Sequence, residues 1–186
     1  MVVLGELRAT LGGDREVLSD NLDRFRAAAG RLAALRAHIE AGAGYSDSLD
    51  ANFGALYGLR ISQVNASPYE SLKSRGLDLV SGDSLRAQIT RVFDLRYGML
   101  ENMHRTQRSV VLDALRPYFL AHFKDLEFNR SATPLDYSFV VSDQSFINLL
   151  DYRIEVMETA EIPTLSVIVA DVDRLIEALD RELAGH

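Results

Sequence analysis

Apolar residues recur every seven positions through the first forty residues of the chain. The repeating positions are Leu4, Leu11, Leu18, Phe25, Leu32 and Ile39, and Leu7, Leu22 and Leu35 widen the stripe. One apolar face sustained at this spacing predicts an amphipathic helix, which we place at residues 3–41. Gly12 and Gly13 each cost about 1 kcal/mol relative to alanine within a helix. We therefore expect a bend or short break there, with Asp14 capping the restart.

Two more long helices are predicted from the same kind of pattern, over residues 84–116 and 143–183. The first of them starts at Ser81 or Asp83. Pro117 lacks an amide donor and clashes with the preceding turn, so we expect a kink, or a stop near Arg116 with a short continuation through Phe123. Pro163 divides the apolar stripe of the last helix and should kink it.

The lengths of these helices indicate how they pack. At about 1.5 Å per residue, forty residues span roughly 60 Å, which another long helix can cover. We expect the first and last helices to run antiparallel, with the helix at 84–116 as the third rod. The predicted fold is all-α: an elongated helical bundle of three long helices that forms a single domain over residues 1–186.

Shorter elements complete the expected fold. A helix at 47–58 contains Gly54 and Gly58, which permit a neighbour to approach closely. A helix at 68–75 begins at Pro68: Ser67 is the expected cap, Glu70 should bond back to its amide, and Gly76 should end the helix. Residues 125–142 show no helical period, and we expect an irregular segment with a short strand at residues 139–141.

Composition and charge exclude several classes of protein. The 186 residues include no cysteine, so disulfides and thiolate metal sites are impossible. Residues 1–142 carry 17 basic and 17 acidic residues, whereas residues 143–186 carry 3 and 10, which accounts for the net charge of −7. An acidic chain repels phosphate backbones, so no nucleic-acid partner is expected. No apolar run approaches the roughly 18–20 residues that span a bilayer, so we expect no membrane contact from this chain itself.

The strongest candidate for chemistry is the pair Glu101 and His104. Glutamate and histidine three residues apart on a bundle helix form half of a di-iron carboxylate site. The other three histidines have no glutamate at that spacing, so the pair is a weak metal candidate and we predict no cofactor. The sequence contains no catalytic motif, and we predict no catalytic residue and no enzyme activity.

Polar residues on the later helices are candidates for ligand binding. A pocket could form near Arg96, Asn102, Asn148 and Arg153, although a buried polar network is the commoner arrangement. The arginines at 105, 108 and 116 allow two interpretations. They can pair with the acidic last helix, which is the usual fate of such residues, or form an anionic ligand site.

Two stretches resemble a known family. Residues 69–80 read YESLKSRGLDLV, Asp83-Ser84-Leu85-Arg86 follows, and residues 146–153 read FINLLDYR. With the leading amphipathic helix, they resemble an uncharacterised family of bacterial single-pass membrane-anchored proteins with a helical soluble domain. This chain lacks the anchor. The resemblance implies the periplasmic face of the inner membrane if an anchor precedes this fragment; otherwise we expect a cytoplasmic protein.

Function is therefore expected to be non-enzymatic, either sensing or protein–protein interaction. A protein partner or a homo-oligomer fits the seven-residue stripe of the first helix, which could pair between chains. The alternative is a bundle that binds a small molecule or a metal near Glu101 and His104.

Overall fold

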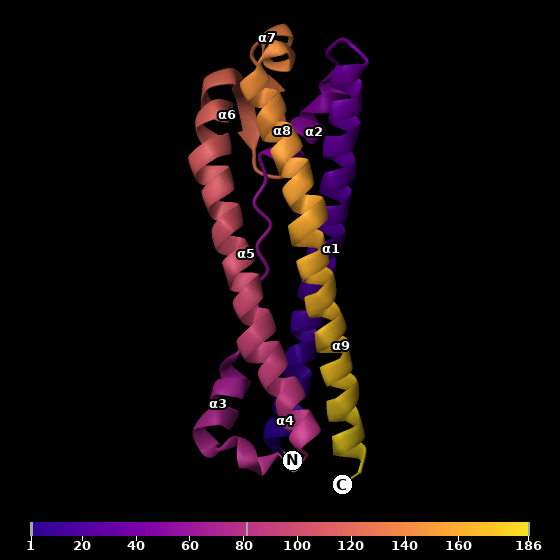
Figure 1. Cartoon of the computed structure of the whole chain (residues 1–186), viewed down its shortest axis with the longest axis vertical. Helices are drawn as coiled ribbons and strands as arrows, with labels where there is room; N and C mark the ends of the chain where they lie inside the picture. Colours follow the sequence, from indigo (N-terminus) through magenta and orange to yellow (C-terminus); the bar gives the residue numbers. More distant parts are fainter. Residues whose placement is uncertain (1, 81, 186) are drawn as a thin grey trace. The chain divides into compact units, whose positions relative to one another are not determined.

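The computed structural model describes residues 2–80 and 82–185 and consists mostly of helices, with one two-stranded sheet (Figure 1). This confirms the all-α helical bundle. Ser81, one of the two expected helix starts, lies outside the described residues. The short elements are η1 (Asp47–Leu49), α2 (Asp50–Leu56), α3 (Ser67–Arg75), η2 (Leu77–Leu79), β1 (Phe123–Glu127), β2 (Ser131–Pro134) and α7 (Tyr137–Ser142).

Contacts group the chain into two compact units. Unit 1 comprises Met1–Leu22, Ser62–Asn102 and Thr164–His186, and unit 2 comprises Asp23–Ile61 and Met103–Pro163. Each unit contains part of every long helical run. That residues 1–186 form a single domain stays a prediction.

The first long helix, α1 (Val2–Glu40), continues through Gly12 and Gly13. The predicted break is wrong. Leu11 and Leu18, on either side of the glycines, are fully buried, and burial of two leucines outweighs the propensity cost of two glycines. Gly42 ends the helix in a left-handed conformation that favours glycine, with a φ of 62°. The amide of Ala43 then donates to the carbonyl of His38 at 3.3 Å.

The second long helical run passes Arg116 and ends at His122, close to the continuation expected through Phe123. It comprises α4 (Asp83–Thr90), η3 (Arg91–Arg96), α5 (Tyr97–Ser109), η4 (Val110–Leu115) and α6 (Arg116–His122), where η3 and η4 are π-helical. Pro117 does not stop the helix at Arg116. The carbonyl four residues before it belongs to the wider η4 turn, where amides bond five residues back. The π-helical turn therefore makes room for the proline ring.

The last helical run has the same arrangement around Pro163. It comprises α8 (Gln144–Val156), the π-helical η5 (Met157–Glu161) and α9 (Ile162–Ala184). The amide of Ile162 donates to the carbonyl of Met157, five residues earlier. In both runs, the π-helical segment ends two residues before the proline.

Ion pairs fix the direction of α9 against α1 in unit 1, where the two helices lie side by side (Figure 1). Arg8 contacts Asp180 at 2.7 Å, and Arg15 contacts Asp173 at 2.9 Å. Seven residues forward on α1 thus match seven residues backward on α9. The predicted antiparallel packing is confirmed for this unit.

Five of the six positions in the seven-residue stripe of α1 are buried inside the chain's own core, and Ile39 is half-buried. Leu4, Leu11 and Leu18 lie in the core of unit 1, and Phe25 and Leu32 in that of unit 2. Because these side chains already have intramolecular partners, they cannot form a seam between chains. The structure does not support that route to self-association.

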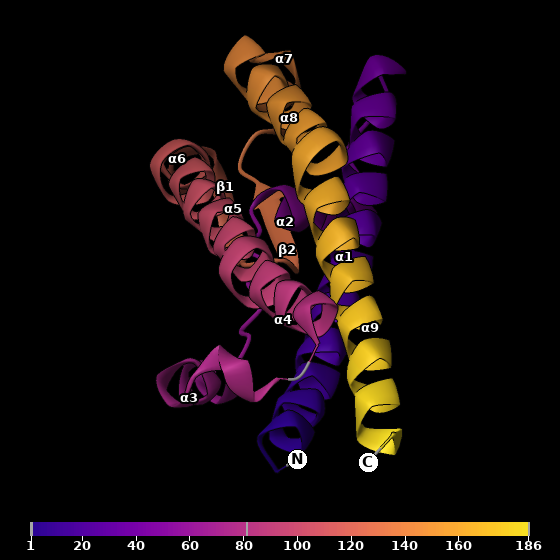
Figure 2. The ribbon, with the colours of Figure 1, turned by 60° about the horizontal axis from the view of Figure 1, so that its bottom comes forward.

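Unit 2 contains a β-hairpin where an irregular segment was expected. Phe123 pairs with Pro134, and Glu127 with Ser131, in an antiparallel sheet that α2 packs against (Figure 2). Gly54 of α2 explains the close packing, because a Cβ atom there would lie 2.3 Å from the backbone nitrogen of Ser131. The predicted strand at residues 139–141 is wrong, since these residues belong to α7.

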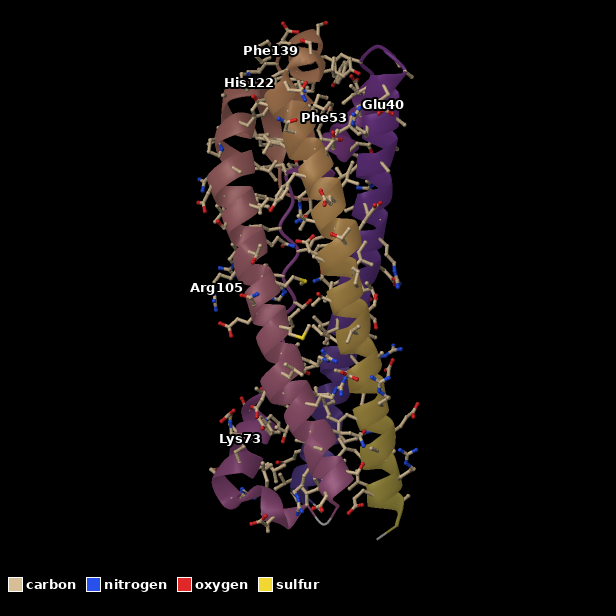
Figure 3. All side chains as sticks on the ribbon, viewed as in Figure 1. Glu40, Phe53, Lys73, Arg105, His122 and Phe139 are labelled. Atoms are coloured by element: carbon tan, nitrogen blue, oxygen red, sulfur yellow. The ribbon has the colours of Figure 1, made fainter. Side chains whose placement is uncertain are left out.

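Aromatic side chains fill the core beside this hairpin. The ring centroids of Phe53 and Phe123 lie 5.2 Å apart, and those of Phe53 and Phe146 lie 5.8 Å apart. Figure 3 shows Phe53 among the interior side chains, and His122 close to Phe139, with ring centroids 5.0 Å apart.

Residues 57–66 form an extended segment that is neither helix nor strand. Buried side chains satisfy its polar groups. In unit 1, Asn21 donates to the hydroxyl of Ser62 at 2.6 Å, and the amide of Asn65 donates to Asp14 at 3.0 Å. In unit 2, the amide of Arg60 donates to Gln107 at 2.6 Å. These polar residues are buried because irregular backbone must find partners outside itself.

The start of α3 differs from the predicted capping box. Ser67 is the first residue of the helix, and its amide donates to the side chain of Asn65 at 3.0 Å. Glu70 contacts Lys73 at 3.3 Å. Asn65 therefore takes the place expected of Glu70. Gly76 follows α3 with a φ of 101°, a conformation that favours glycine.

Candidate functional site

Asp171 of α9 is a buried carboxylate that three arginines contact in unit 1. Arg91 Nε and Arg96 Nε donate to its Oδ2 atom at 3.0 and 2.5 Å, and Arg174 donates to Oδ1. Burial raises the pKa of Asp171, but the hydrogen bonds from Arg96, Arg174 and Arg91 outweigh it and lower the pKa to about 2. Asp171 is thus a fixed negative charge that holds three guanidinium groups.

The π-helical segment η3 brings two of these arginines together. Arg91 and Arg96 stand at its two ends, five residues apart. On an α-helix, residues three and four apart share a face, whereas those five apart diverge. The wider π-helical turn, with its bonds five residues back, aligns this spacing instead. It places both side chains on one carboxylate.

A hollow of about 460 Å³ lies next to this cluster, lined by residues of the α4–η3 segment and of α9. Its lining residues are Gln88, Arg91, Val92, Asp171, Arg174, Glu177 and Arg181. Three of these residues are arginines and two are carboxylates, and Arg96 also contacts Asp171. The hollow therefore carries excess positive charge although the chain as a whole is acidic.

The arginines of the hollow have donors to spare. Arg91 and Arg174 each engage Asp171 through one nitrogen atom, and their side chains are 54% and 62% exposed. A guanidinium carries five N–H donors in a planar fork that matches carboxylate and phosphate oxygens. The arrangement suits the binding of an anion.

A second polar cluster lies in the core of unit 2. Arg153 is fully buried, and its Nη1 atom donates to Glu161 at 2.8 Å. Gln107 donates to the other oxygen of Glu161 at 3.2 Å and accepts the backbone amide of Arg60. Burial lowers the pKa of Arg60 to about 10, and the nearby charge of Arg153 adds to this effect.

Glu101 and His104 fall in different surroundings. Glu101 is exposed in unit 1, and His104 is half-buried in unit 2. Burial lowers the pKa of His104, Arg108 lowers it further, and Glu161 opposes them. Within residues 2–80 and 82–185, no three His, Cys, Asp or Glu side chains gather as a metal site requires.

The four predicted ligand residues are divided between the two units, with Arg96 and Asn102 in unit 1 and Asn148 and Arg153 in unit 2. Arg96 contacts Asp171 in unit 1, and Arg153 lies in the core of unit 2. Asn102 is exposed, and so is Asn148, which accepts a hydrogen bond from Gln144 at 2.9 Å. Arg96 and Arg153 thus belong to two separate clusters, and neither asparagine joins them.

The basic residues at 105, 108 and 116 are exposed in unit 2, and Arg105 projects away from the surrounding helix in Figure 3. Carboxylates of the last helical run pair with arginines of α1, of η3 and of the run itself. In unit 2, Asp151 pairs with Arg36 of α1 at 2.7 Å.

Sequence reasoning missed Asp171, Arg91 and Arg174. Arg91 and Arg96 are five residues apart, which matches no α-helical face, and their carboxylate partner lies 75 positions further along the chain from Arg96. Asp171 did carry one signal, because it stands beside Val172 in the apolar stripe of the last helix.

No helix in the described part of the chain is both long and apolar enough to cross a membrane. The chain matches no protein-family model, no curated protein and no solved structure.

Proposed function

We propose that this chain is a non-enzymatic helical domain that senses a small anion bound in the hollow between α4–η3 and α9. The observation that carries this proposal is the set of three arginines held on the buried carboxylate of Asp171 at the edge of that hollow. The absence of a catalytic motif from the sequence supports binding rather than catalysis.

Asp171 prepares the site for an anion. Free arginine side chains lose rotamer entropy when they bind, at a cost of about 0.5–1.5 kcal/mol each. Asp171 already orders Arg91 and Arg174 before a ligand arrives. Much of that cost is therefore met during folding, and the remaining N–H donors are free to bind.

The volume and charge of the hollow indicate the ligand class. Small-molecule sites occupy about 300–1,000 Å³, and this hollow measures about 460 Å³. Val92 supplies an apolar wall, whereas Arg91, Arg174 and Arg181 supply positive charge. We propose a small organic molecule that carries a phosphate or carboxylate group.

A sensing role follows from the elements that line the hollow. Gln88 and Arg91 are about 80 positions distant in sequence from Asp171 and Arg174. An anion that binds to both sides cross-links α9 to the α4–η3 segment and stabilises unit 1. Occupancy is thereby converted into a change in the stability of the fold, which a partner can detect.

Isothermal titration calorimetry with inorganic phosphate and with succinate, at constant ionic strength, tests this proposal. We expect Arg91→Gln and Arg174→Gln each to weaken binding by about 10- to 100-fold, the usual value of a charge-assisted hydrogen bond. Arg75→Gln, at an exposed arginine of α3, is the matched control and should bind as the wild type does. Equal affinities in all four proteins would refute the site.

A further inference from the structure

The guanidinium of Arg153 is fully buried, yet in the described part of the chain only its Nη1 atom has a hydrogen-bond partner. Its Nη1 atom donates to Glu161 at 2.8 Å. In the described part of the chain, its Nε and Nη2 atoms have no hydrogen-bond partner. A buried donor without a partner is costly, and more so when it is charged. A group of matching chemistry is therefore expected at these atoms.

The two unpaired nitrogens define the shape of that group. In a planar guanidinium, the Nε–H bond and one N–H bond of Nη2 point in the same direction from one edge. That edge binds two acceptor oxygens side by side, as in arginine–carboxylate pairs. Glu161 occupies the other side of the same guanidinium through Nη1. The open edge therefore fits a ligand with two oxygen atoms.

The net charge of the cluster indicates the charge of the ligand. Arg60 and Arg153 are two buried guanidinium groups, whereas Glu161 is a single buried carboxylate. Gln107 is neutral and has both ends engaged, with the amide of Arg60 and with Glu161. His104, half-buried nearby, has a pKa lowered by burial, which opposes a positive charge there. The cluster thus carries one positive charge in excess, which an anion would balance.

We propose that the core of unit 2 holds a small oxyanion, such as formate, bicarbonate or nitrate, on the Nε–Nη2 edge of Arg153. This site lies in unit 2 and does not rest on the anion hollow of unit 1. The ligand is small because Arg153 has no exposed surface, so that it enters only when the helices around it open transiently.

Thermal unfolding in mixed salts tests the proposal. Sodium chloride is replaced stepwise by sodium formate, and separately by sodium nitrate, at fixed ionic strength. At ten times the dissociation constant, a bound oxyanion should raise the unfolding midpoint of the wild type by about 3–6 °C. Nonspecific salt effects appear equally in Arg153→Met, which replaces the guanidinium with an apolar side chain of similar length, and are subtracted.

Two more variants test whether binding requires the planar Nε–Nη2 edge of Arg153 or only its positive charge. Arg153→Lys keeps the charge but removes the planar edge, and it should lose the formate-dependent rise. Glu161→Gln removes the competing carboxylate, and it should enlarge the rise if it folds. Binding at Arg153 itself is measured by the chemical shift of its Nε–H signal in ¹⁵N NMR. This shift should change as formate is added and should then saturate.

If the wild-type midpoint follows that of Arg153→Met in every salt and the Nε–H signal does not move, water completes the cluster and the proposal is wrong. If Arg153→Lys retains the full formate-dependent rise in the unfolding midpoint, the planar Nε–Nη2 edge is not the binding group. The proposed oxyanion geometry is then wrong.

Discussion

The phenol of Tyr97 on the second helical run donates a 2.6 Å hydrogen bond to the carboxylate of Asp14 on α1, and both residues are buried in unit 1. The same carboxylate accepts the backbone amide of Asn65 at 3.0 Å. Asp14 therefore joins two helical runs to the extended segment. Burial raises its pKa, although the hydrogen bonds from Tyr97 and Asn65 oppose that rise.

Tyr97→Phe should lower the free energy of unfolding by about 1–3 kcal/mol, because it removes one partner of a buried carboxylate. Urea unfolding followed by circular dichroism measures this change. Tyr152→Phe, at a side chain about half exposed, is the control and should stay within about 0.5 kcal/mol of the wild type. A loss of similar size in both variants would mean that the Tyr97–Asp14 bond contributes little.

Acid should weaken the arginine cluster in a defined pH range. The folded pKa of Asp171 is about 2, below its usual 3.8, so its pairing contributes stability that is fully present above pH 4. That stability is lost as the pH falls from about 4 towards 2. Asp14, with a raised pKa, has the opposite sign and gains stability as the pH falls through its folded pKa.

The test is the unfolding midpoint of the wild type and Asp171→Asn as a function of pH. The difference between the two proteins should be large and constant above pH 4 and should shrink between pH 4 and 2. A difference that does not change with pH over this range would show that Asp171 is not paired in the folded protein.

Gly13→Ala should stabilise the protein by about 0.5–1 kcal/mol. Residue 13 lies inside an uninterrupted helix, and a Cβ atom there would meet no atom within 4 Å. Alanine has the higher helix propensity and loses less backbone entropy on folding. The matched control is Gly42→Ala, which should destabilise by about 1–2 kcal/mol because residue 42 has a positive φ. Destabilisation by Gly13→Ala would contradict the continuous helix.

Gly54→Ala should destabilise unit 2 by about 1–3 kcal/mol or more, the usual cost of overpacking. The added Cβ would lie 2.3 Å from the backbone nitrogen of Ser131, so α2 and β2 must separate. Gly98→Ala, on α5, meets no atom within 4 Å and should be neutral or stabilising. Chemical denaturation of the two variants provides the comparison, and a neutral Gly54→Ala would mean that the hairpin can move away at little cost.

Periodicity predicted the three long helical runs because each buries a continuous apolar stripe, and burial of that stripe dominates their stability. Periodicity could not predict where the packed helix tolerates a residue that normally breaks helices. Pro117 and Pro163 are tolerated because a π-helical turn precedes each of them, and one extra residue per turn is invisible in a short apolar pattern. The hairpin around Asn129, whose φ is 64°, was missed because its strands are short and their pairing contains a bulge.

The candidate sites were predictable only in part, for a different reason. Arg96 and Arg153 were candidates for lining a pocket, and both take part in clusters. Their partners, Asp171 and Glu161, are separated from other members of the same clusters by tens of residues. Such pairing depends on the register between helices, which hydrophobic periodicity alone does not specify. The asparagines at 102 and 148 were candidates for the same pocket, but both are exposed.

The most direct measurement of anion binding in the hollow is a ¹⁵N NMR titration with inorganic phosphate at constant ionic strength. The largest saturable shifts should fall on the Nε–H signals of Arg91 and Arg174 and on the backbone amide of Gln88, which line the hollow. The Nε–H signal of Arg75 should move little. Shifts that are absent, or that spread equally over Arg75 and the hollow arginines without saturating, would contradict the proposed site.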